Sequence, residues 1–571
     1  MHGRHVLIAS FSFAIGLLGV ACGDDGNGPA GLQPDLLTIT PDSGTVGTLV
    51  EIVGSNFEPG ARAAFGGWEV DSVIFVDGTT LLAFAPDSVK RDMSYDVRVT
   101  NPGGKSDDLP AAYRGVEPDL KVVNGVSRPS GNNASTVILE GESFGDLLNK
   151  GRAFFTDDAG RPVEAPVALP ENWTNDFIVT AVPNSAASGP VWIETPTGVT
   201  DSVVFTVTQS ATFSPSQISW TETQPLPTPE QGHGTIFLRI DEGSGAGNLV
   251  YVTGGADGTL TPNATVAYSG VDGSGNFSAY TTETSLPAAR AFHGAAAATP
   301  FNALIDTLVA GYLYVIGGID DTGTATKTVY KASVARDRSV DSWTTTTALP
   351  TPLHSMGVTV FRSWLYIAGG ATTGDVPRQE VYRARIGEDG SLGVWESQAS
   401  LPYARAYAPL VQVAGVLYSL GGETGIVPPG DNSLTTTRSA DIYYHRLNLR
   451  TGELREASWS ENPSSLIKAL SRHSAVAVGG TILVSGGLYG GAANSSTEQQ
   501  YASINLDGTI GSFGGATGSQ TIAGSSGAGG VPFFHHAAIG YVDAGDVAHV
   551  VILGGNNVED PIAPVDKTYY Y

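Results

Sequence analysis

Six of the ten histidines stand just before or at the start of an apolar strand in a repeated pattern. They are His233, His293, His354, His473, His535 and His536. Three arginines, Arg290, Arg405 and Arg472, fall in the same segments. An imidazole can bind a metal ion or transfer a proton near neutral pH. The segments before these strands therefore contain the best candidates for ligand binding or catalysis.

Three explanations fit this placement. Repetition of one structural unit by itself puts equivalent residues at equivalent positions, where they serve the fold. The same side chains can instead contact a ligand, and the third explanation is catalysis or metal binding. We predict a ligand-binding set and no catalytic residue, metal site or cofactor. The set comprises His233, His293, His354, Arg290, Arg405, Arg472, His473 and His536.

The strands that position these residues belong to a unit that is repeated six times. Each unit contains an apolar run that ends in Gly-Gly, and successive Gly-Gly pairs are 52 to 68 residues apart. A supersecondary unit repeated on this scale, with loop insertions, is typical of a propeller blade. The six runs are Tyr251–Gly255, Tyr314–Gly318, Tyr366–Gly370, Tyr418–Gly422, Leu483–Gly487 and Val551–Gly555.

Each unit offers four short strands separated by turn residues. In four units an aromatic residue stands six positions before a Leu-Pro pair, at Trp220, Tyr280, Trp343 and Trp395. Asp-Gly pairs at 272–273, 389–390 and 507–508 precede the aromatic strand and favour tight hairpins. Antiparallel alternation puts the segments that carry the histidines at the same end as the loops after Gly-Gly. We therefore expect the histidines and arginines to crowd one mouth of a central channel.

The runs of the Tyr-Val-Ile-Gly-Gly type, the later tyrosine strands and the tryptophans resemble the kelch propeller family over residues 213–571. The resemblance implies a six-bladed β-propeller. The last unit ends in a tyrosine strand, Thr568–Tyr571, and lacks a fourth strand of its own. The unclaimed aromatic strand at Ser219–Thr223 is expected to complete it, so that an N-terminal outer strand closes the ring.

Residues 34–208 show short alternating strands split by Gly, Pro and Asn turns, which predicts small β-sandwiches. Residues 34–116 resemble the immunoglobulin-like IPT/TIG domain, through segments such as Val50–Phe57 and Tyr95–Gly104. Residues 117–209 repeat the pattern as a second IPT/TIG-like domain, with an insertion around Asp157–Trp173. The resemblance implies spacers or contacts to protein and carbohydrate. The predicted fold class of the whole chain is all-β.

The first 33 residues are predicted to precede any folded domain. An apolar stretch, Val6–Ala21, is short for a membrane span and ends at Cys22. It resembles a bacterial lipoprotein signal, which implies a signal peptide at 1–21, lipid attachment at Cys22 and a flexible tether at 22–33. Gly19 stands where such signals usually carry Leu, so an ordinary cleaved signal peptide is the alternative. The lipoprotein interpretation implies export and anchoring in the bacterial envelope by the lipid alone.

The net charge of −26 argues against nucleic acid as a partner, because phosphate recognition needs clusters of Lys and Arg. Solubility of an exported protein explains this acidity. Calcium bound by Asp-bearing loops is the alternative, although no EF-hand spacing occurs. Cys22 is the only cysteine, so no disulfide can form within the chain.

The residues also bear on enzyme classes. Copper oxidases of the kelch class need a tyrosine linked to a cysteine, which the position of the lone Cys22 excludes. A six-bladed kelch sugar epimerase of the mutarotase kind needs an arginine and a carboxylate at the mouth, and Arg290, Arg405 and Glu230 are candidates. We predict an envelope-anchored protein that binds a protein or glycan through the propeller without catalysis. The carbohydrate-acting enzyme is the alternative.

Overall fold

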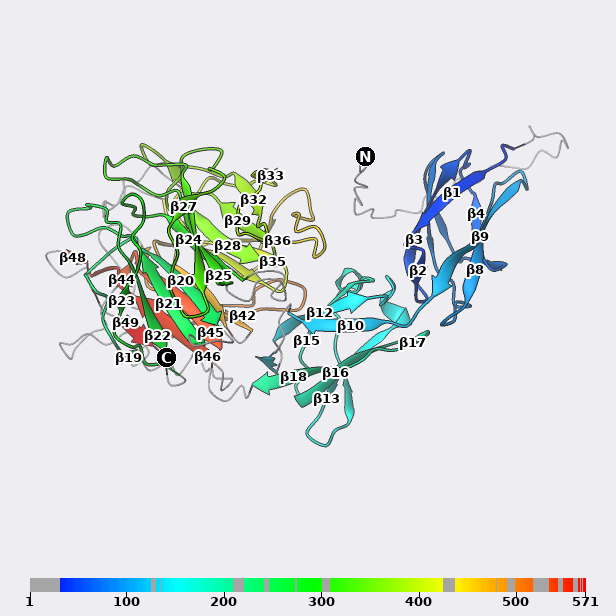
Figure 1. Cartoon of the computed structure of the whole chain (residues 1–571), viewed down its shortest axis with the longest axis horizontal. Coiled ribbons are helices and arrows are strands. Elements are labelled where there is room, and N and C mark those ends of the chain that lie inside the picture. Colours follow the sequence, from blue (N-terminus) through cyan, green and yellow to red (C-terminus); the bar gives the residue numbers. More distant parts are fainter. Residues whose placement is uncertain are drawn as a thin grey trace. The chain divides into compact units, whose positions relative to one another are not determined.

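The computed structural model describes most of the chain from residue 31 onward. The described residues are 31–124, 130–133, 135–208, 220–240, 246–272, 275–299, 309–424, 437–478, 480–489, 499–516, 533–542, 548–557, 563–564, 566 and 568–570. Their regular structure consists of β-strands and two short 3-10 helices, which confirms the all-β prediction (Figure 1). No helix in these ranges is long and apolar enough to cross a membrane. Cys22 and the apolar stretch before it lie outside the described residues.

The first sandwich contains two mainly antiparallel sheets. Along each strand, residues that face the core alternate with residues that face outward. Val50 and Ile52, two positions apart on one strand, are both fully buried, and Leu81 and Val97 join them in the core. One sheet has the order β1 (Asp35–Thr40), β3 (Leu49–Ser55), β7 (Thr80–Phe84), β6 (Val73–Asp77). The other has the order β2 (Ser43–Gly44), β9 (Ser106–Gly115), β8 (Ser94–Thr100), β4 (Arg62–Phe65), β5 (Trp68–Glu69).

The second sandwich repeats this two-sheet plan with fewer strands in one sheet. The smaller sheet has the order β10 (Asp119–Val123), β12 (Thr136–Glu142), β15 (Phe177–Ala181). The larger has the order β11 (Ser130–Asn132), β18 (Val203–Thr208), β16 (Ala187–Thr195), β13 (Arg152–Thr156), β14 (Pro162–Glu164), with β17 (Gly198–Val199) beside β16. The 3-10 helices are η1 (Leu148–Lys150) and η2 (Pro170–Asn172). The predicted insertion thus contains β14 and η2.

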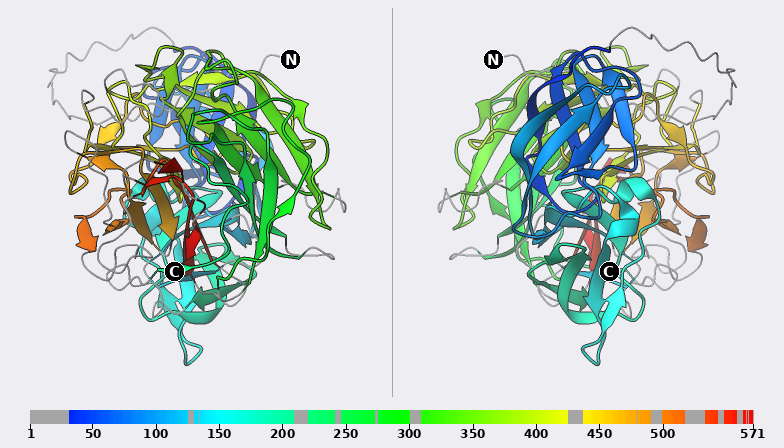
Figure 2. Two further views of the ribbon diagram at one scale, coloured as in Figure 1. Left: turned by 90° about the vertical axis from the view of Figure 1, so that its left-hand side faces the viewer. Right: turned by 90° about the vertical axis from the view of Figure 1, so that its right-hand side faces the viewer.

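The rest of the chain forms six four-stranded antiparallel sheets, drawn from green to red in Figures 1 and 2. In chain order the first three are β20 (Gly234–Ile240), β21 (Gly247–Thr253), β22 (Val266–Val271), β23 (Thr281–Thr282); β24 (Gly294–Ala298), β25 (Val309–Ile316), β26 (Val329–Ala335), β27 (Thr344–Thr345); and β28 (Gly357–Phe361), β29 (Trp364–Ala368), β32 (Val381–Arg385), β33 (Glu396–Gln398). The last three are β34 (Leu410–Val413), β35 (Val416–Leu420), β36 (Ile442–Arg446), β37 (Ser460–Glu461); β39 (Ser474–Val478), β40 (Thr481–Ser485), β42 (Gln499–Ser503), β43 (Gly514–Ala516); and β45 (Ala537–Val542), β46 (Ala548–Leu553), β49 (Thr568–Tyr570), β19 (Thr221–Glu222). We call this part of the chain the six-sheet region.

Short ribbons accompany the third, fifth and sixth of these sheets. They are β30 (Ala371–Thr372) with β31 (Val376–Pro377), β38 (Leu470–Ser471) with β41 (Leu488–Tyr489), and β44 (Phe533–Phe534) with β47 (Asn556–Asn557) and β48 (Ala563–Pro564). The first strands of consecutive sheets lie side by side, and the first strand of the sixth sheet lies beside that of the first. The six sheets therefore follow one another in a closed cycle.

The outer strand of the sixth sheet comes from the opposite end of the region. In β19, Thr221 pairs with Tyr570 and Glu222 pairs with Tyr569 of β49. This is the pairing that the unclaimed aromatic strand predicted, although Ser219 lies outside the described residues. The pairing covers an edge of the last sheet and ties the two ends of the region together.

The residues that define the repeat form bonds between neighbouring sheets. The Tyr314 hydroxyl donates to the carbonyl oxygen of Gly390 in the next sheet at 2.7 Å. The Trp395 indole donates to the carbonyl oxygen of Thr347 in the previous sheet at 3.0 Å. Equivalent bonds are donated by Tyr251, Tyr418, Trp343 and Trp459. The repeated aromatic residues therefore fix each sheet to the next.

The Gly-Gly pairs are required by backbone conformation and by close approach. The first glycine of each pair has a φ between 52° and 63°, and the second between 91° and 117°. A Cβ on Gly317 would lie 2.4 Å from the carbonyl oxygen of Leu353 in the next sheet. The Gly318 amide donates to that same oxygen at 2.8 Å. Only glycine readily adopts this positive φ and also lets the neighbouring carbonyl oxygen approach so closely.

Candidate binding site at the central mouth

A closed ring of backbone hydrogen bonds surrounds one end of the six-sheet region. One residue just before each first strand donates its amide to the carbonyl oxygen of its counterpart in the preceding sheet, at 2.7 to 3.3 Å. The Gly232 amide donates to His535 and closes the cycle. We call these six residues the collar: Gly232, Phe292, Ser355, Tyr407, Arg472 and His535.

All six collar residues adopt the left-handed conformation, with φ between 53° and 60°. Five of them are not glycine, and such a conformation persists only where the surrounding structure imposes it. Their side chains meet at the centre: the Phe292 and His535 rings are 5.1 Å apart, and Tyr407 and His535 are 5.4 Å apart. The Arg472 guanidinium lies 4.7 Å from the Tyr407 ring centroid. The collar therefore narrows this end of the region with a mixed aromatic and polar cluster.

A cavity of about 170 Å³ lies at the collar, and we call this place the central mouth. Its lining includes all six collar residues and the residues that follow them. Five members of the predicted ligand-binding set line it together: His233, His293, Arg472, His473 and His536. The structure thus brings these side chains to one mouth, as the strand alternation predicts.

Four of these histidines, however, fit between neighbouring sheets. The Nε2 atom of His293 lies 2.9 Å from Thr253 Oγ1, and that of His536 lies 2.9 Å from Ser485 Oγ, each in the preceding sheet. A Cβ on Gly421, the first glycine of its pair, would lie 2.9 Å from the His473 ring. The imidazole thus occupies the space that this glycine leaves open. These contacts run to the adjacent sheet and not within the sheet that carries each histidine.

Burial makes these imidazoles poor proton carriers near neutral pH. Removal from water lowers the pKa of His233 to about 4 and the pKa of His293, His473 and His536 to about 3. Burial also holds the pKa of His535 well below its ordinary value, with the positive charge of Arg472 acting in the same direction. These rings are therefore neutral at physiological pH.

Arg290 and Arg405 belong to the predicted set but do not line the cavity. The Arg290 guanidinium lies 5.3 Å from the Tyr330 ring centroid, and Arg405 donates to the Gly421 carbonyl oxygen at 2.8 Å. Their own carbonyl oxygens accept the amides of the second glycines in Gly-Gly pairs at 2.8 and 2.9 Å. Both arginines therefore join sheets to one another.

Glu230 was the candidate carboxylate beside these arginines. Its carboxylate accepts hydrogen bonds from Thr228 and Asn263, at 2.7 and 3.0 Å. Burial raises its pKa above the ordinary value, against the effect of these two bonds. Both partners are neutral side chains, so within the described residues Glu230 does not form the Arg–carboxylate arrangement that an epimerase needs.

His354 lies behind the collar and departs from the repeat. Its Nδ1 atom is 3.1 Å from Ser355 Oγ, and its Nε2 atom is 3.3 Å from Asp375 Oδ1. Alanine stands at the equivalent place in the second and fourth sheets, at Ala291 and Ala406. His354 is therefore a member of the predicted set that reaches the cavity only through its neighbour Ser355.

Glu423 is a second departure from the repeat, and sequence reasoning missed it. It is completely buried and accepts hydrogen bonds from Ser471 Oγ at 2.7 Å and Arg472 Nε at 3.0 Å. Arg438 lies close by and donates to Ser471 at 3.0 Å; burial lowers its pKa, and the charge of Glu423 opposes that shift. Small or apolar residues fill the equivalent place in the first three sheets, namely Ala256, Ile319 and Ala371.

Sequence reasoning also missed Phe292, Ser355 and Tyr407, which line the cavity. Burial raises the pKa of Tyr407 to about 12, while Arg472 and a contact with Ser355 act in the opposite direction. A usable signal was present, because each collar residue immediately precedes a histidine or its counterpart in the repeat. The polar groups that break the repeat gather in the third to fifth sheets, which gives the mouth one polar side.

Two of the loops that follow Gly-Gly, Thr424–Arg438 and Leu488–Glu498, are expected at this mouth, and parts of both lie outside the described residues. Among the residues that are described, no group of three or more His, Cys, Asp or Glu side chains is placed to hold a metal ion.

Comparison with known proteins identifies one part of the chain. Residues 34–113 match the family model of the IPT/TIG domain, which confirms the resemblance of the first sandwich. No curated protein matches the chain. Among solved structures, the chain is similar to one described as "Structure of YjhT", with a TM-score of 0.41 and 12% identity, over 61% of this chain and 95% of that chain.

Proposed function

We propose that residues 213–571 form a six-bladed kelch-type β-propeller and that residues 117–209 form a second IPT/TIG-like domain. We further propose that the chain binds a protein or glycan at the central mouth, without catalysis. The IPT/TIG domain at residues 34–113 agrees with a binding or interaction role. The propeller is supported by the closed cycle of six collar hydrogen bonds, which agrees with a ring of six sheets.

The observation that carries the binding role is the polar side of the central mouth. Ser355, Tyr407 and Arg472 line a small cavity on a scaffold whose backbone is fixed by the collar. A rigid scaffold with a few convergent polar groups is the usual basis of a ligand site. The neutral, buried histidines beside them support the fold and leave recognition to these groups.

A binding screen of the full chain against glycans and envelope extracts tests this proposal. The double variant Ser355→Ala/Tyr407→Phe removes two hydroxyls and keeps the aromatic packing, so we expect ligand binding to weaken by roughly tenfold. Tyr443→Phe removes a tyrosine hydroxyl away from the cavity and serves as the matched control. We also expect replacement of residues 425–436 by a short Gly-Ser turn to abolish binding. A ligand that responds instead to changes in the Asp389 and Asp507 hairpins would place the site at the other end.

The second candidate is a carbohydrate-acting enzyme, and the Arg472–Glu423 pair favours it. The two groups meet at 3.0 Å beside the cavity, as an arginine and a carboxylate of an epimerase would. Their burial, with side-chain exposures of 0% and 1%, favours a structural role. Anomer exchange of reducing sugars, followed by NMR with and without the protein, distinguishes the two candidates.

We also propose that Cys22 carries a lipid that holds the chain in the bacterial envelope. The apolar run that ends at this lone cysteine supports the proposal. Cys22→Ser is expected to move the protein from the membrane fraction into the soluble fraction. A variant that still sediments with membranes in high salt would contradict it.

A further inference from the structure

The second sandwich contains a pocket of about 500 Å³, in the range typical of small-ligand sites. It arises where this sandwich departs from the first. In the first sandwich, β6 is the fourth strand of one sheet and precedes β7. In the second, the corresponding sheet has three strands, and residues 165–176 contain η2 and no strand. The missing strand leaves the inner residues of this side open to a pocket.

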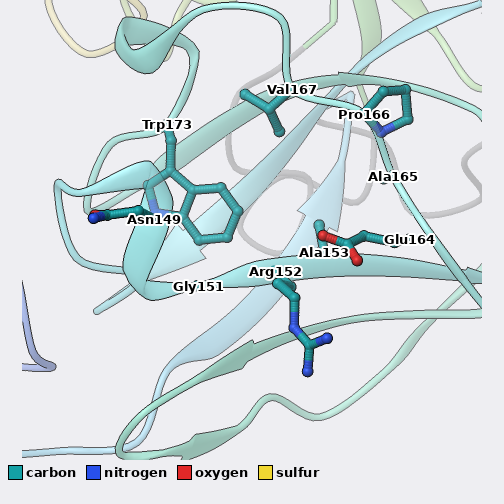
Figure 3. Close-up of a pocket in the computed structure, with 9 residues that line it drawn as sticks. All are labelled: Asn149, Gly151, Arg152, Ala153, Glu164, Ala165, Pro166, Val167 and Trp173. Carbon is teal, nitrogen blue, oxygen red and sulfur yellow. The ribbon is translucent and has the colours of Figure 1, made fainter.

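The pocket has an apolar side and a charged side. Asn149 comes from η1, Gly151 follows it, and Arg152 and Ala153 begin β13. Glu164, Ala165, Pro166, Val167 and Trp173 come from β14 and the inserted segment. Figure 3 shows Trp173 and Val167 on one side and Arg152 and Glu164 on the other. A ligand that fits must therefore present both an apolar face and hydrogen-bonding groups.

The Trp173 indole is fixed in place. Its Nε1 atom donates to the Phe144 carbonyl oxygen at 3.3 Å, and the side chain is only 2% exposed. A Cβ on Gly151 would lie 2.4 Å from Trp173 Cζ2, so a glycine is needed where the indole passes. The apolar wall is therefore part of the rigid core of the sandwich and does not have to form on binding.

The charged side remains available to solvent. The Arg152 side chain is 58% exposed. One of its guanidinium nitrogens donates to Glu194 at 3.1 Å, which leaves further N–H donors. Glu164 and Asn149 are exposed, and neither side chain makes a hydrogen bond or ion pair within the part of the chain that the structure describes. A carboxylate that only accepts, beside a guanidinium that only donates, suits a group that does both.

We propose that this pocket binds one neutral sugar residue of a glycan. Each sugar hydroxyl both donates and accepts, so neighbouring hydroxyls can bridge Glu164 and Arg152, and the C–H face can pack on Val167 and Trp173. One positive and one negative charge across the pocket favour a ligand without net charge. The inference rests on the proposed binding role and adds a second site, separate from the central mouth.

The test measures binding of glucose, galactose, mannose, N-acetylglucosamine and their disaccharides to the full chain, by saturation-transfer NMR and calorimetry. Glu164→Ala and Arg152→Ala each remove charge-assisted hydrogen bonds, and we expect each to weaken binding by roughly tenfold. Arg161→Ala is the matched control, because Arg161 is 75% exposed on the same sandwich and does not line the pocket. Unchanged sugar binding in Arg161→Ala would show that loss of a surface arginine does not by itself weaken binding.

Two outcomes overturn the inference: no sugar of the panel binds, or binding is the same in Glu164→Ala and Arg152→Ala as in the parent chain. The mouth double variant Ser355→Ala/Tyr407→Phe separates this result from the proposed function. A sugar lost in the double variant and kept in the pocket variants refutes the pocket and supports the mouth. A sugar lost only in the pocket variants supports the pocket, even if nothing binds at the mouth.

Discussion

The central mouth and the pocket of the second sandwich both gather charged groups, but they hold them differently. At the mouth, Arg472 and Glu423 are buried and bonded to each other. In the pocket, Arg152 is 58% exposed, and the exposed Glu164 makes no hydrogen bond or ion pair with the described residues. A buried charge that loses its partner is strongly destabilising, whereas an exposed one is solvated by water. At the mouth the Arg472–Glu423 pair therefore joins sheets while Arg472 also lines the site, whereas the pocket leaves its charges for a ligand.

The origin of the two regions differs as well. The mouth is built by repetition, because one residue from each of six sheets enters the same collar. The pocket is built by a departure from repetition, because the second sandwich lacks the strand that β6 provides in the first. The backbone at the repeated positions thus serves closure, and the side chains that break the repeat are the better guide to ligand sites.

The largest effect is expected from breaking the closure of the six-sheet region. Deleting residues 1–224 removes β19, the outer strand that pairs with Tyr569 and Tyr570. We expect a loss on the order of 5 kcal/mol in the free energy of unfolding, because the sixth sheet loses a strand and its packing. Deleting residues 1–210 keeps β19 and is the control. Equal urea unfolding of the two proteins would show that closure does not depend on β19.

Removal of one carboxylate from each region tests the contrast between the mouth and the pocket most directly. Glu423→Ala leaves the buried guanidinium of Arg472 without its carboxylate, and we expect a loss of about 3–5 kcal/mol in the free energy of unfolding. Glu164→Ala in the pocket removes an exposed carboxylate, and we expect a change within about 0.5 kcal/mol. Urea unfolding of both variants measures the difference. Similar losses in the two would remove the distinction between the regions.

The pH dependence of stability is expected to come partly from the mouth histidines. The folded pKa of His293 is lowered to about 3 from an ordinary value of 6.5, so between these values only the unfolded chain takes up the proton. Stability is therefore complete above pH 6.5 and falls as the pH drops. From pH 7.5 to 5.0, His293→Gln should lose roughly 2 kcal/mol less stability than the parent chain. Arg152→Ala should follow the parent, and an unchanged pH slope in His293→Gln would mean that the imidazole is charged in the fold.

The smallest effect on stability is expected in the pocket. Arg152→Ala removes an exposed side chain and one surface ion pair, so the free energy of unfolding should change by less than about 1 kcal/mol. The substitution should instead weaken sugar binding, which thermal unfolding does not measure. A large drop in the unfolding midpoint would instead assign Arg152 a structural role like that of Arg405.

Much of the architecture could be predicted from local patterns. The six Gly-Gly runs, the tyrosine strands and the aromatic outer strands predicted six four-stranded sheets, and the strands are present at those places. The unclaimed strand near Trp220 predicted the pairing of β19 with β49. These features are local or repeated, so strand alternation and turn residues identify them without knowledge of distant contacts.

The sequence by itself determined the repeat, the IPT/TIG domain and the gathering of histidines at one mouth. Only the tertiary structure decided what those residues do there. Collar residues such as Ser355 and Tyr407 are 52 positions apart in the chain, and they become neighbours through hydrogen bonds between sheets. The pocket beside Trp173 likewise depends on a strand that does not form. Contacts between sheets and the space left by an absent strand have no local sequence pattern, because both depend on where distant segments pack.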